Sequence, residues 1–458
     1  MCFFTNRTLE AREMGGKVFQ RNFKAVMPRV VKGEGIYLYD EEGKRYLDGC
    51  SGALISNLGH GVPEIIDAIT EQLKTIEFAH TSRWRSAALE EAAEEVASIA
   101  PEGLDYVWFV SGGSEAVESA IKLARQYFVE RDGVSTSKAL VVARWNSYHG
   151  STIGTMAVGG SIPRRRIYSP LFKEYPKIVA HYCYRCPFGK KYPQCGITCA
   201  HQLEDIIKNI GSQYISAFIA EPMVGSAIGA LVPPDEYWPI VREICDRYDI
   251  LLIADEVMTG FGRTGANFCV NHWNVIPDII ATAKGMAAGY IPTGGIIIRN
   301  EIAETVRNGS GAFVHGHTYN GNPVSGAATA AVIRYMKKHD LVTNARLQGE
   351  KLGRGLKEIE ASNPIVGDVR GRGLMWGVEL VMDKESKKPF PKSKGAAALA
   401  MKECLDRGIV IYPGGGMVDG IDGDNFLIGP PLVITAEQVD ELLNKLEEGL
   451  TATAEKLL

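Results

Sequence analysis

A lysine ends an apolar run of the kind that fills a buried strand. The stretch 277–290 reads PDIIATAKGMAAGY, and Lys284 stands between the apolar run and a series of small residues. A second such run, DILLIADEV, ends near Asp255 and Glu256. In open α/β sheets ligands bind beyond the carboxyl ends of the strands, so we expect these three side chains near a binding site. A desolvated lysine amine is a nucleophile and a proton carrier, whereas a buried carboxylate needs a cationic or hydrogen-bonding partner.

The turn that follows the apolar run DYVWFV predicts an anion-binding site. It consists of Ser111, Gly112, Gly113 and Ser114, and a helical pattern begins directly after it. The free backbone N–H groups and the dipole of a helix N-terminus attract anions such as phosphate. As separate features, Ser114 is also a good helix N-cap, Asp255 can belong to a structural ion pair, and Lys284 can extend from a strand end to solvent.

Together the three features describe a site for pyridoxal 5′-phosphate (PLP). The turn would hold the phosphate, the strand-end aspartate would face the protonated ring nitrogen, and the strand-end lysine would bond covalently to the cofactor. Tyr148 and His149 follow another apolar run, KALVVA, so that the Tyr148 ring can lie on one face of the cofactor and Val257 on the other. Thr318, in HGHTYNGNP, offers a hydroxyl for a further phosphate contact.

For these residues to lie close together, the strands that precede them must belong to one sheet and end on the same side of it. From about residue 63, helical patterns alternate with short apolar runs, namely DYVWFV, KALVVA, ISAFIAEP, DILLIADEV and PDIIATAK. Strands of this composition, separated by helices, are typical of a mainly parallel sheet in an α/β protein with helices on both faces. Before them, GEGIYLYDEEGKRYLDGCSG predicts a small antiparallel hairpin. From residue 329, long helices around a few strands predict a second, smaller α/β unit.

The composition limits the class of protein. Of the 458 residues, 45% are hydrophobic and 23% are charged, and the net charge is −4. We find no run of basic residues interleaved with aromatic ones, so nucleic acid is not an expected partner. No stretch is apolar over the roughly 18 residues that a membrane helix needs, and residues 1–16 do not read as a signal peptide. We therefore expect a cytoplasmic protein.

Nine cysteines, an odd number spread along the chain, favour reduced thiols over a disulfide framework. Four of them lie close together in CYRCPFGKKYPQCGITC: Cys183, Cys186, Cys195 and Cys199. Their spacing is similar to that of paired metal knuckles, and a structural zinc site is one interpretation. The gap between the two pairs is short for two independent knuckles, which favours a Gly/Pro-rich surface segment with reduced thiols.

The order of the motifs resembles a known enzyme family. SGGSEA, YHG, AEP, DEVMTGFGRTG, ATAKG, HTYNGNP and VRGRGLMWGVEL are similar to the motifs of class III, ω-type aminotransferases of PLP fold type I, from about Gly33 to the C-terminus. The resemblance implies a homodimer, or a tetramer, whose active sites lie at the subunit interface. It also implies a large PLP-binding domain over residues 59–328 and a small domain built from residues 1–58 and 329–458.

The resemblance assigns roles to the residues that match the motifs. Lys284, Asp255 and Tyr148 are the expected catalytic residues: Lys284 bonds to the cofactor and moves a proton, Asp255 keeps the ring nitrogen protonated, and Tyr148 stacks on the ring. Thr318 would reach the phosphate bound by the neighbouring subunit. The full set of expected cofactor contacts is Ser111, Gly112, Gly113, Ser114, Tyr148, His149, Glu221, Asp255, Val257, Met258, Lys284 and Thr318.

The expected reaction is a ping-pong transfer of an amino group from a donor amine to a 2-oxo acid. In the family pattern Arg370, in VRG, binds the acceptor's carboxylate; Arg372 is the less favoured choice, with an ion pair as its other role. Ser226 stands where relatives that act on ornithine or γ-aminobutyrate carry a glutamate, which favours an ω-amino acid or amine donor and pyruvate as acceptor. Leu54 and Trp84 are candidates for the substrate entrance, and ordinary packing explains them equally well.

A PLP lyase or isomerase, such as a dialkylglycine decarboxylase or an aminomutase, is the main alternative. Dialkylglycine decarboxylases share a serine at position 226 and the VRGRG sequence, but they carry a glutamine where this chain has Ala53. A metal-binding interaction module built on the four clustered cysteines is a third hypothesis. The motifs favour an aminotransferase over both.

Overall fold

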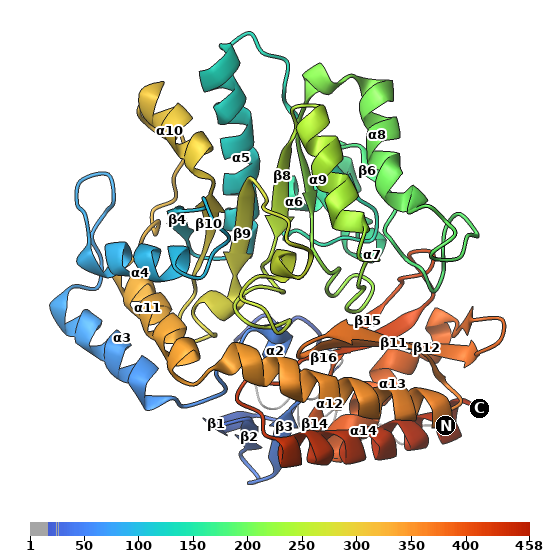
Figure 1. The fold of residues 1–458 in the computed structure, drawn as a ribbon. Coiled ribbons are helices and arrows are strands. Elements are labelled where there is room, and N and C mark those ends of the chain that lie inside the picture. Colours follow the sequence, from blue (N-terminus) through green and yellow to red (C-terminus); the bar gives the residue numbers. More distant parts are fainter. Residues whose placement is uncertain (1–16, 24, 26) are drawn as a thin grey trace.

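The computed structural model describes residues 17–23, 25 and 27–458. Residues 1–16, where we expected no signal peptide, lie outside the described residues. The chain forms a larger unit around a seven-stranded sheet and a smaller unit with two further sheets (Figure 1). Within the described part of the chain, no helix has both the length and the apolar character needed to cross a membrane.

Seven strands form the large sheet: β4 (Tyr106–Val110), β5 (Leu140–Arg144), β6 (Lys177–Ile178), β7 (Ile215–Ala220), β8 (Leu251–Asp255), β9 (Ile279–Ala283) and β10 (Gly294–Ile298). Their order across the sheet is β4-β10-β9-β8-β7-β5-β6. The strands from β9 to β6 pair in parallel, whereas β10 is antiparallel to both β9 and β4. The expected mainly parallel sheet is confirmed, and β6 and β10 are additional strands that were not among the expected ones.

Helices cover both faces of the large sheet (Figure 1). In strand β7, Ala217 and Ile219 pack into a core with α5 (Gly113–Asp132) and α10 (Asn300–Asn308). Phe218 and Ala220 of the same strand pack into a core with α8 (Thr198–Ile210) and α9 (Tyr237–Arg247). Side chains alternate along a strand, so a strand that is apolar at every position must be covered on both sides. The helices of this unit are α3 (Pro63–Thr75), α4 (Ala87–Ala97), α5 (Gly113–Asp132), α6 (Ile153–Val158), α7 (Ile162–Arg165), α8 (Thr198–Ile210), α9 (Tyr237–Arg247) and α10 (Asn300–Asn308).

The smaller unit contains two sheets from both ends of the chain. One joins β1 (Val30–Glu34), β2 (Tyr37–Asp40), β3 (Arg45–Asp48) and β14 (Ile409–Val410). The other joins β11 (Val366–Arg372), β12 (Met375–Asp383), β16 (Asp424–Ile428) and β15 (Tyr412–Gly415), and β13 (Lys388–Pro389) pairs with β12. The expected hairpin is confirmed, because β2 and β3 pair antiparallel.

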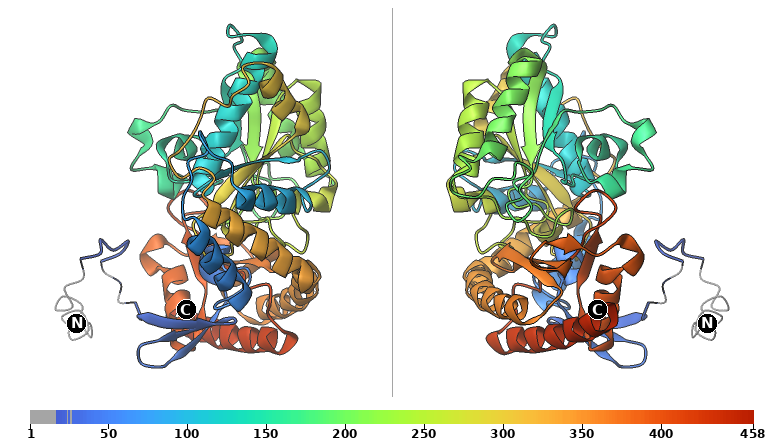
Figure 2. Two further views of the ribbon diagram at one scale, coloured as in Figure 1. Left: turned by 90° about the vertical axis from the view of Figure 1, so that its left-hand side faces the viewer. Right: turned by 90° about the vertical axis from the view of Figure 1, so that its right-hand side faces the viewer.

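The two chain ends meet in the first of these sheets. β3 pairs in parallel with β14, with Leu47 opposite Ile409, and the N-terminal strands lie beside the C-terminal helix (Figure 2). The domain boundaries expected after residues 58 and 328 stay a prediction. The remaining helices are α2 (Ser51–Leu54), α11 (Pro323–Lys338), α12 (Leu341–Ser362), α13 (Ala396–Asp406) and α14 (Ala436–Leu457).

The long helices of the smaller unit have well-defined starts and one apolar face. The Asn322 side chain accepts hydrogen bonds from two backbone N–H groups in the first turn of α11, and a proline follows it. Thr435 and Gln438 form a capping box at the start of α14. Leu356 of α12 and Leu446 of α14 are buried in a core shared with the sheets. This packing fixes β11, which carries Arg370, within the smaller unit.

Candidate active site

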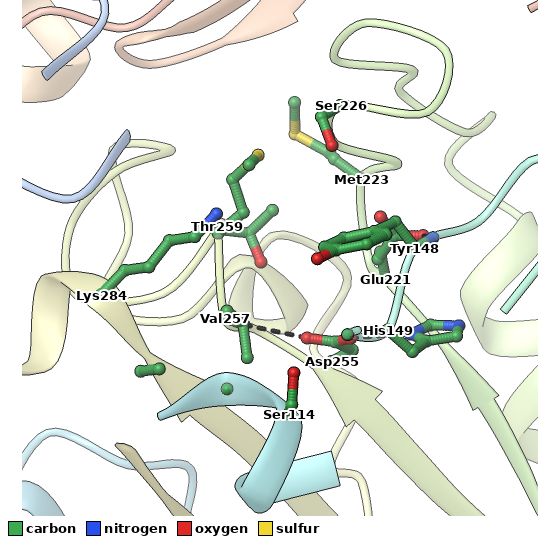
Figure 3. A pocket seen from close by; sticks show the side chains of 14 residues that line it. Ser114, Tyr148, His149, Glu221, Met223, Ser226, Asp255, Val257, Thr259 and Lys284 are labelled. Atoms are coloured by element: carbon green, nitrogen blue, oxygen red, sulfur yellow. Dashed lines mark hydrogen bonds and ion pairs between the residues drawn. The ribbon is translucent and has the colours of Figure 1, made fainter. Parts of the chain in front are cut away.

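A cavity of about 170 Å³ lies at the edge of the large sheet where β5, β7, β8 and β9 end. Its side chains come from the segments directly after these strands and from the start of α5 (Figure 3). The carboxyl ends of parallel strands are where α/β proteins bind ligands. The lining residues are Gly113, Ser114, Tyr148, His149, Gly150, Glu221, Met223, Ser226, Asp255, Val257, Met258, Thr259, Ala283 and Lys284.

Lys284 follows β9 directly, and its side chain lines the cavity (Figure 3). Its backbone φ is +45°, in the left-handed region that residues other than glycine rarely adopt. Such conformations persist where the surrounding structure imposes them, and they cluster at functional sites. No described residue forms a hydrogen bond or an ion pair with the Lys284 amine. Burial lowers the pKa of this amine to about 8; Asp255 opposes this shift and Arg164 adds to it.

Asp255, the last residue of β8, is a buried carboxylate with two hydrogen-bond partners. Its Oδ2 lies 2.7 Å from Nδ1 of His149, and its Oδ1 accepts a hydrogen bond of 3.1 Å from the backbone N–H of Val257. His149 is buried as well, and no described residue contacts its Nε2 by a hydrogen bond. These contacts hold the carboxylate at the cavity wall, where it can stabilise a positive charge on a ligand.

The N-terminus of α5 lies at one end of the cavity (Figure 3). Ser114 Oγ accepts a hydrogen bond of 3.0 Å from the backbone N–H of Ser151, which ties the helix to the segment after β5. A Cβ atom on residue 113 would lie 2.9 Å from Cγ1 of Val257, so Gly113 keeps the space between them open. The free N–H groups and the helix dipole make this end suitable for an anion such as phosphate.

Tyr148 forms one wall of the cavity, and Glu221 fixes its position. The backbone N–H of Tyr148 donates to Oε2 of Glu221 at 3.3 Å, and the N–H of Gly225 donates to Oε1 at 3.1 Å. Burial raises the pKa of the Glu221 carboxyl. One buried carboxyl group thereby connects the segment after β5 with the segment after β7 and presents the Tyr148 ring to the cavity.

The structure brings most of the expected cofactor contacts together. Ser111 and Gly112 precede the lining residues of the same turn, and the backbone N–H of Ser111 donates to Oε2 of Glu115 at 2.8 Å. Their expected contact with the cofactor stays a prediction. The expected residues that line the cavity are Gly113, Ser114, Tyr148, His149, Glu221, Asp255, Val257, Met258 and Lys284.

Three other expected residues lie outside the cavity lining. Thr318 is exposed on the segment before α11, so its expected role requires a second copy of the chain. Leu54 is only 1% exposed and belongs to an apolar core, and Trp84 is 68% exposed. The sequence left open whether Leu54 lines the substrate entrance or packs in the core, and its burial supports packing in the core.

Arg370, the residue expected to bind the acceptor's carboxylate, is paired with protein carboxylates. Its guanidinium forms ion pairs with Asp368 at 2.5 Å and with Glu379 at 2.9 Å. It also donates to the backbone carbonyls of residues 228–229. Arg370 does not line the cavity, and these four partners occupy most of its N–H groups. In this arrangement a substrate carboxylate would have to displace two protein carboxylates to bind Arg370.

One residue near the cavity is absent from the sequence-based set. Arg164 lies in α7, and its guanidinium carbon is 4.1 Å from the centre of the Tyr148 ring. Its NH1 donates to Oγ of Ser226 at 3.0 Å. In the sequence it belongs to the run Arg164-Arg165-Arg166, which is typical of a solvated helix end, so its position at the cavity could not be predicted.

The four clustered cysteines are free thiols. Cys183 is exposed, and Cys186, Cys195 and Cys199 are partly buried. Burial raises the pKa of the Cys199 thiol to about 11, whereas zinc binds the thiolate. Among the described residues, no group of three or more His, Cys, Asp or Glu side chains is arranged to hold a metal ion. The segment has the exposure pattern of a partly packed surface loop, and burial disfavours the thiolate form of Cys199.

The lowered pKa of Lys284 leads to a prediction for the protein without cofactor. Below pH 8 the amine is mostly protonated, so its reductive methylation by formaldehyde and cyanoborohydride should increase about tenfold per pH unit up to pH 8 and level off above it. Mass spectrometry of the peptide that contains Lys284 measures the extent of modification at each pH. A rate that continues to rise beyond pH 10 would contradict the lowered pKa.

The residues around the cavity fit PLP. The start of α5 suits a phosphate group, and the space that Gly113 leaves open would be filled by any larger residue. The buried Asp255 suits a protonated ring nitrogen, and the amine of Lys284 has no protein partner that a covalent bond would have to displace. The aromatic Tyr148 and the apolar Val257 supply surfaces for a flat ring.

Comparison with known proteins agrees with this geometry. The Aminotransferase class-III family matches residues 18–450. The uncharacterised aminotransferase YodT of Bacillus subtilis (strain 168) is 38% identical over 444 residues, which are 97% of this chain and 99% of that protein. Putrescine–pyruvate aminotransferase of Pseudomonas aeruginosa is 35% identical over 431 residues, 94% of this chain and 91% of that protein. A PLP-bound amine transaminase structure from an uncultivated Pseudomonas species has a TM-score of 0.87 at 33% identity, covering 96% of this chain and 98% of that one.

Proposed function

The chain belongs to the class III aminotransferases, a PLP-dependent enzyme family of PLP fold type I, and from this premise we propose its reaction. It transfers an amino group from an ω-amino acid or an amine donor to a 2-oxo acid, with pyruvate as the favoured acceptor. Donor and acceptor use the same cavity in turn, as a ping-pong mechanism requires. The putrescine–pyruvate aminotransferase among its relatives supports pyruvate as acceptor.

The observation that carries this proposal is the amine of Lys284 in the cavity. With a pKa of about 8 and no protein partner, a substantial fraction of this amine is neutral near physiological pH. A neutral amine attacks a carbonyl carbon and also accepts a proton, so one side chain can serve as nucleophile and as general base.

The other residues around the cavity have complementary roles. When bound, PLP draws electrons from the substrate carbon that carries the amino group. The Nζ atom of Lys284 would accept the proton from this carbon and deliver it to the cofactor, which its long flexible side chain permits. Asp255, oriented by His149, would stabilise a proton at the ring nitrogen through its negative charge. Tyr148 and Val257, which both line the cavity, would cover the ring and exclude water from it.

The same proposal includes a homodimer, or a tetramer, in the cytoplasm. The segment around Thr318 exposes large apolar side chains, with Val314 81% and Tyr319 64% exposed. A second copy that covers this segment would bury them and bring Thr318 close to its own cavity, with the same contact repeated across the two-fold axis. Light scattering should therefore give at least twice the mass of one chain.

A panel of amino donors tests the proposed reaction. The PLP-loaded protein is mixed with amines, β-alanine, taurine and α-amino acids, and the visible absorbance of the cofactor is followed. We expect a productive donor to change this absorbance and pyruvate to restore it, with alanine formed in equal amount. Turnover of a single substrate without any 2-oxo acid would instead support a lyase or an isomerase, and faster recovery with 2-oxoglutarate would contradict the choice of pyruvate.

A further inference from the structure

Arg164 is a cation with few partners that lies behind two residues of the cavity lining. It stacks on the Tyr148 ring at 4.1 Å and donates to the Ser226 hydroxyl at 3.0 Å, and both of these residues line the cavity. Within the described part of the chain, Arg164 forms no ion pair with a carboxylate. A guanidinium carries several N–H donors in one plane, so most of those on Arg164 remain available to a ligand.

The other arginines in this region already have acceptors. Arg370 pairs with two carboxylates, and Arg165 pairs with Glu174 at 3.0 Å. Arg263 is fully buried and donates to backbone and side-chain oxygen atoms. Arg164 differs from all three, because the Ser226 hydroxyl is the only hydrogen-bond acceptor that the described residues offer it.

The two ends of the cavity are suited to two different anions. Ser114 and the start of α5 lie at one end, whereas Ser226 and Met223 lie at the other, beyond the Tyr148 ring (Figure 3). Arg164 contacts both Ser226 and Tyr148, so its charge belongs to the second end. A substrate anion whose reacting carbon lies near Lys284 would place its negative charge at this second end. That charge would then lie across the cavity from the end suited to phosphate.

We propose that Arg164 binds the carboxylate of the substrate, and that the site is therefore built for ω-amino acids and 2-oxo acids. This inference rests on the proposed function and gives Arg164 the role expected of Arg370. A guanidinium pairs with a carboxylate through two parallel charge-assisted hydrogen bonds. The Tyr148 ring orients the plane of the guanidinium. The Ser226 oxygen accepts from Arg164, so its own hydrogen is free to donate to the carboxylate.

Arg164→Met and Arg164→Lys test this inference, with Arg166→Met as the matched control. Arg166 follows in the same run but donates to the backbone carbonyl of Gly420, outside the cavity lining. In Arg164→Met we expect KM for pyruvate and for β-alanine to rise about 10- to 100-fold, the effect of losing a charge-assisted hydrogen-bonded pair. In the half-reaction with 1-phenylethylamine, which has no carboxylate, we expect a change below about twofold.

A binding measurement separates recognition from turnover. Propanoate has a carboxylate but no reacting group, and calorimetry with the PLP-loaded protein should show its affinity falling in Arg164→Met by the same factor as KM rises. Arg164→Lys keeps the charge without the planar pair of donors, so we expect a smaller rise in KM, and this variant serves as the test if Arg164→Met does not fold. Arg166→Met should bind propanoate as the natural protein does.

Two results would overturn the role of Arg164. An equal loss of rate with 1-phenylethylamine and with β-alanine would mean that Arg164 only positions Tyr148. An unchanged KM for pyruvate in folded Arg164→Met would mean that another residue binds the carboxylate. In both cases the natural protein still exchanges amino groups, so the proposed function stands. Failure of the natural protein to exchange an amino group with any donor would contradict the proposed function itself.

Discussion

Lys284→Ala is expected to reduce kcat of amino-group transfer by about 10⁴-fold or more, the scale seen when a covalent nucleophile is removed. Alanine can neither bond to the cofactor nor carry a proton between substrate and cofactor. The fold should persist, because the Lys284 amine has no hydrogen-bond or ion-pair partner among the described residues. Steady-state rates with a productive donor and pyruvate measure the loss, and circular dichroism and light scattering check the fold and the mass.

Lys177→Ala is the matched control for this substitution. Lys177 is also a buried lysine, and burial lowers the pKa of its amine to about 8. It donates to the carbonyls of Ala157 and Tyr175 at 3.0 and 3.1 Å and does not line the cavity. We expect its loss to lower the free energy of unfolding but to leave kcat within about twofold. Near-normal rates in folded Lys284→Ala would refute the assignment of the nucleophile.

Asp255→Asn is expected to lower kcat by about 10²- to 10³-fold, the range for removing one preorganised electrostatic contact. The amide has nearly the same shape as the carboxylate, and it can still bond to His149 and to the N–H of Val257. It carries no negative charge, so a protonated ring nitrogen is no longer stabilised. Single-turnover rates of the donor half-reaction measure this effect separately from acceptor binding.

Asp278→Asn, at the opposite end of the strands, provides the control. Asp278 precedes β9, accepts a hydrogen bond from the backbone N–H of Leu252 and pairs with Arg242 and Arg299 at 2.8 and 2.6 Å. In Asp278→Asn we expect lower stability, because two arginines lose their carboxylate, and a rate per folded molecule within about twofold of the natural one. A larger loss of kcat in Asp278→Asn than in Asp255→Asn would contradict the role of Asp255.

Local patterns predict β5, β7, β8 and β9 of the large sheet but neither the two-residue β6 nor β10. The runs that form β7, β8 and β9 are apolar at every position, which identifies them as strands covered on both faces. β10 begins with two glycines, and a Cβ on Gly294 would lie 2.9 Å from the backbone of Gly112. The glycine is therefore required by a close approach of two distant segments, and no local pattern reveals such an approach.

Local patterns likewise predict where some residues of the candidate site lie, but not which side chains contact one another there. The position of Asp255 at a strand end follows from its own segment, but its contact with His149 depends on the strand order. Arg370 is paired because the register of β11 and β12 places Asp368 opposite Glu379, close to its guanidinium. Partners of charged side chains are set by such long-range pairings, so the sequence motif alone could not show that Arg370 is already occupied.

The pairing of Leu47 with Ile409 has a consequence for the order of folding during synthesis. The ribosome releases the N-terminal strands first, yet the partner of β3 follows only after most of the chain has been made. All strands of the large sheet lie between these two segments and can assemble earlier, whereas closing so long a loop is slow. Until then β3 presents an unpaired edge, at which the nascent chain can pair with exposed strands of other chains.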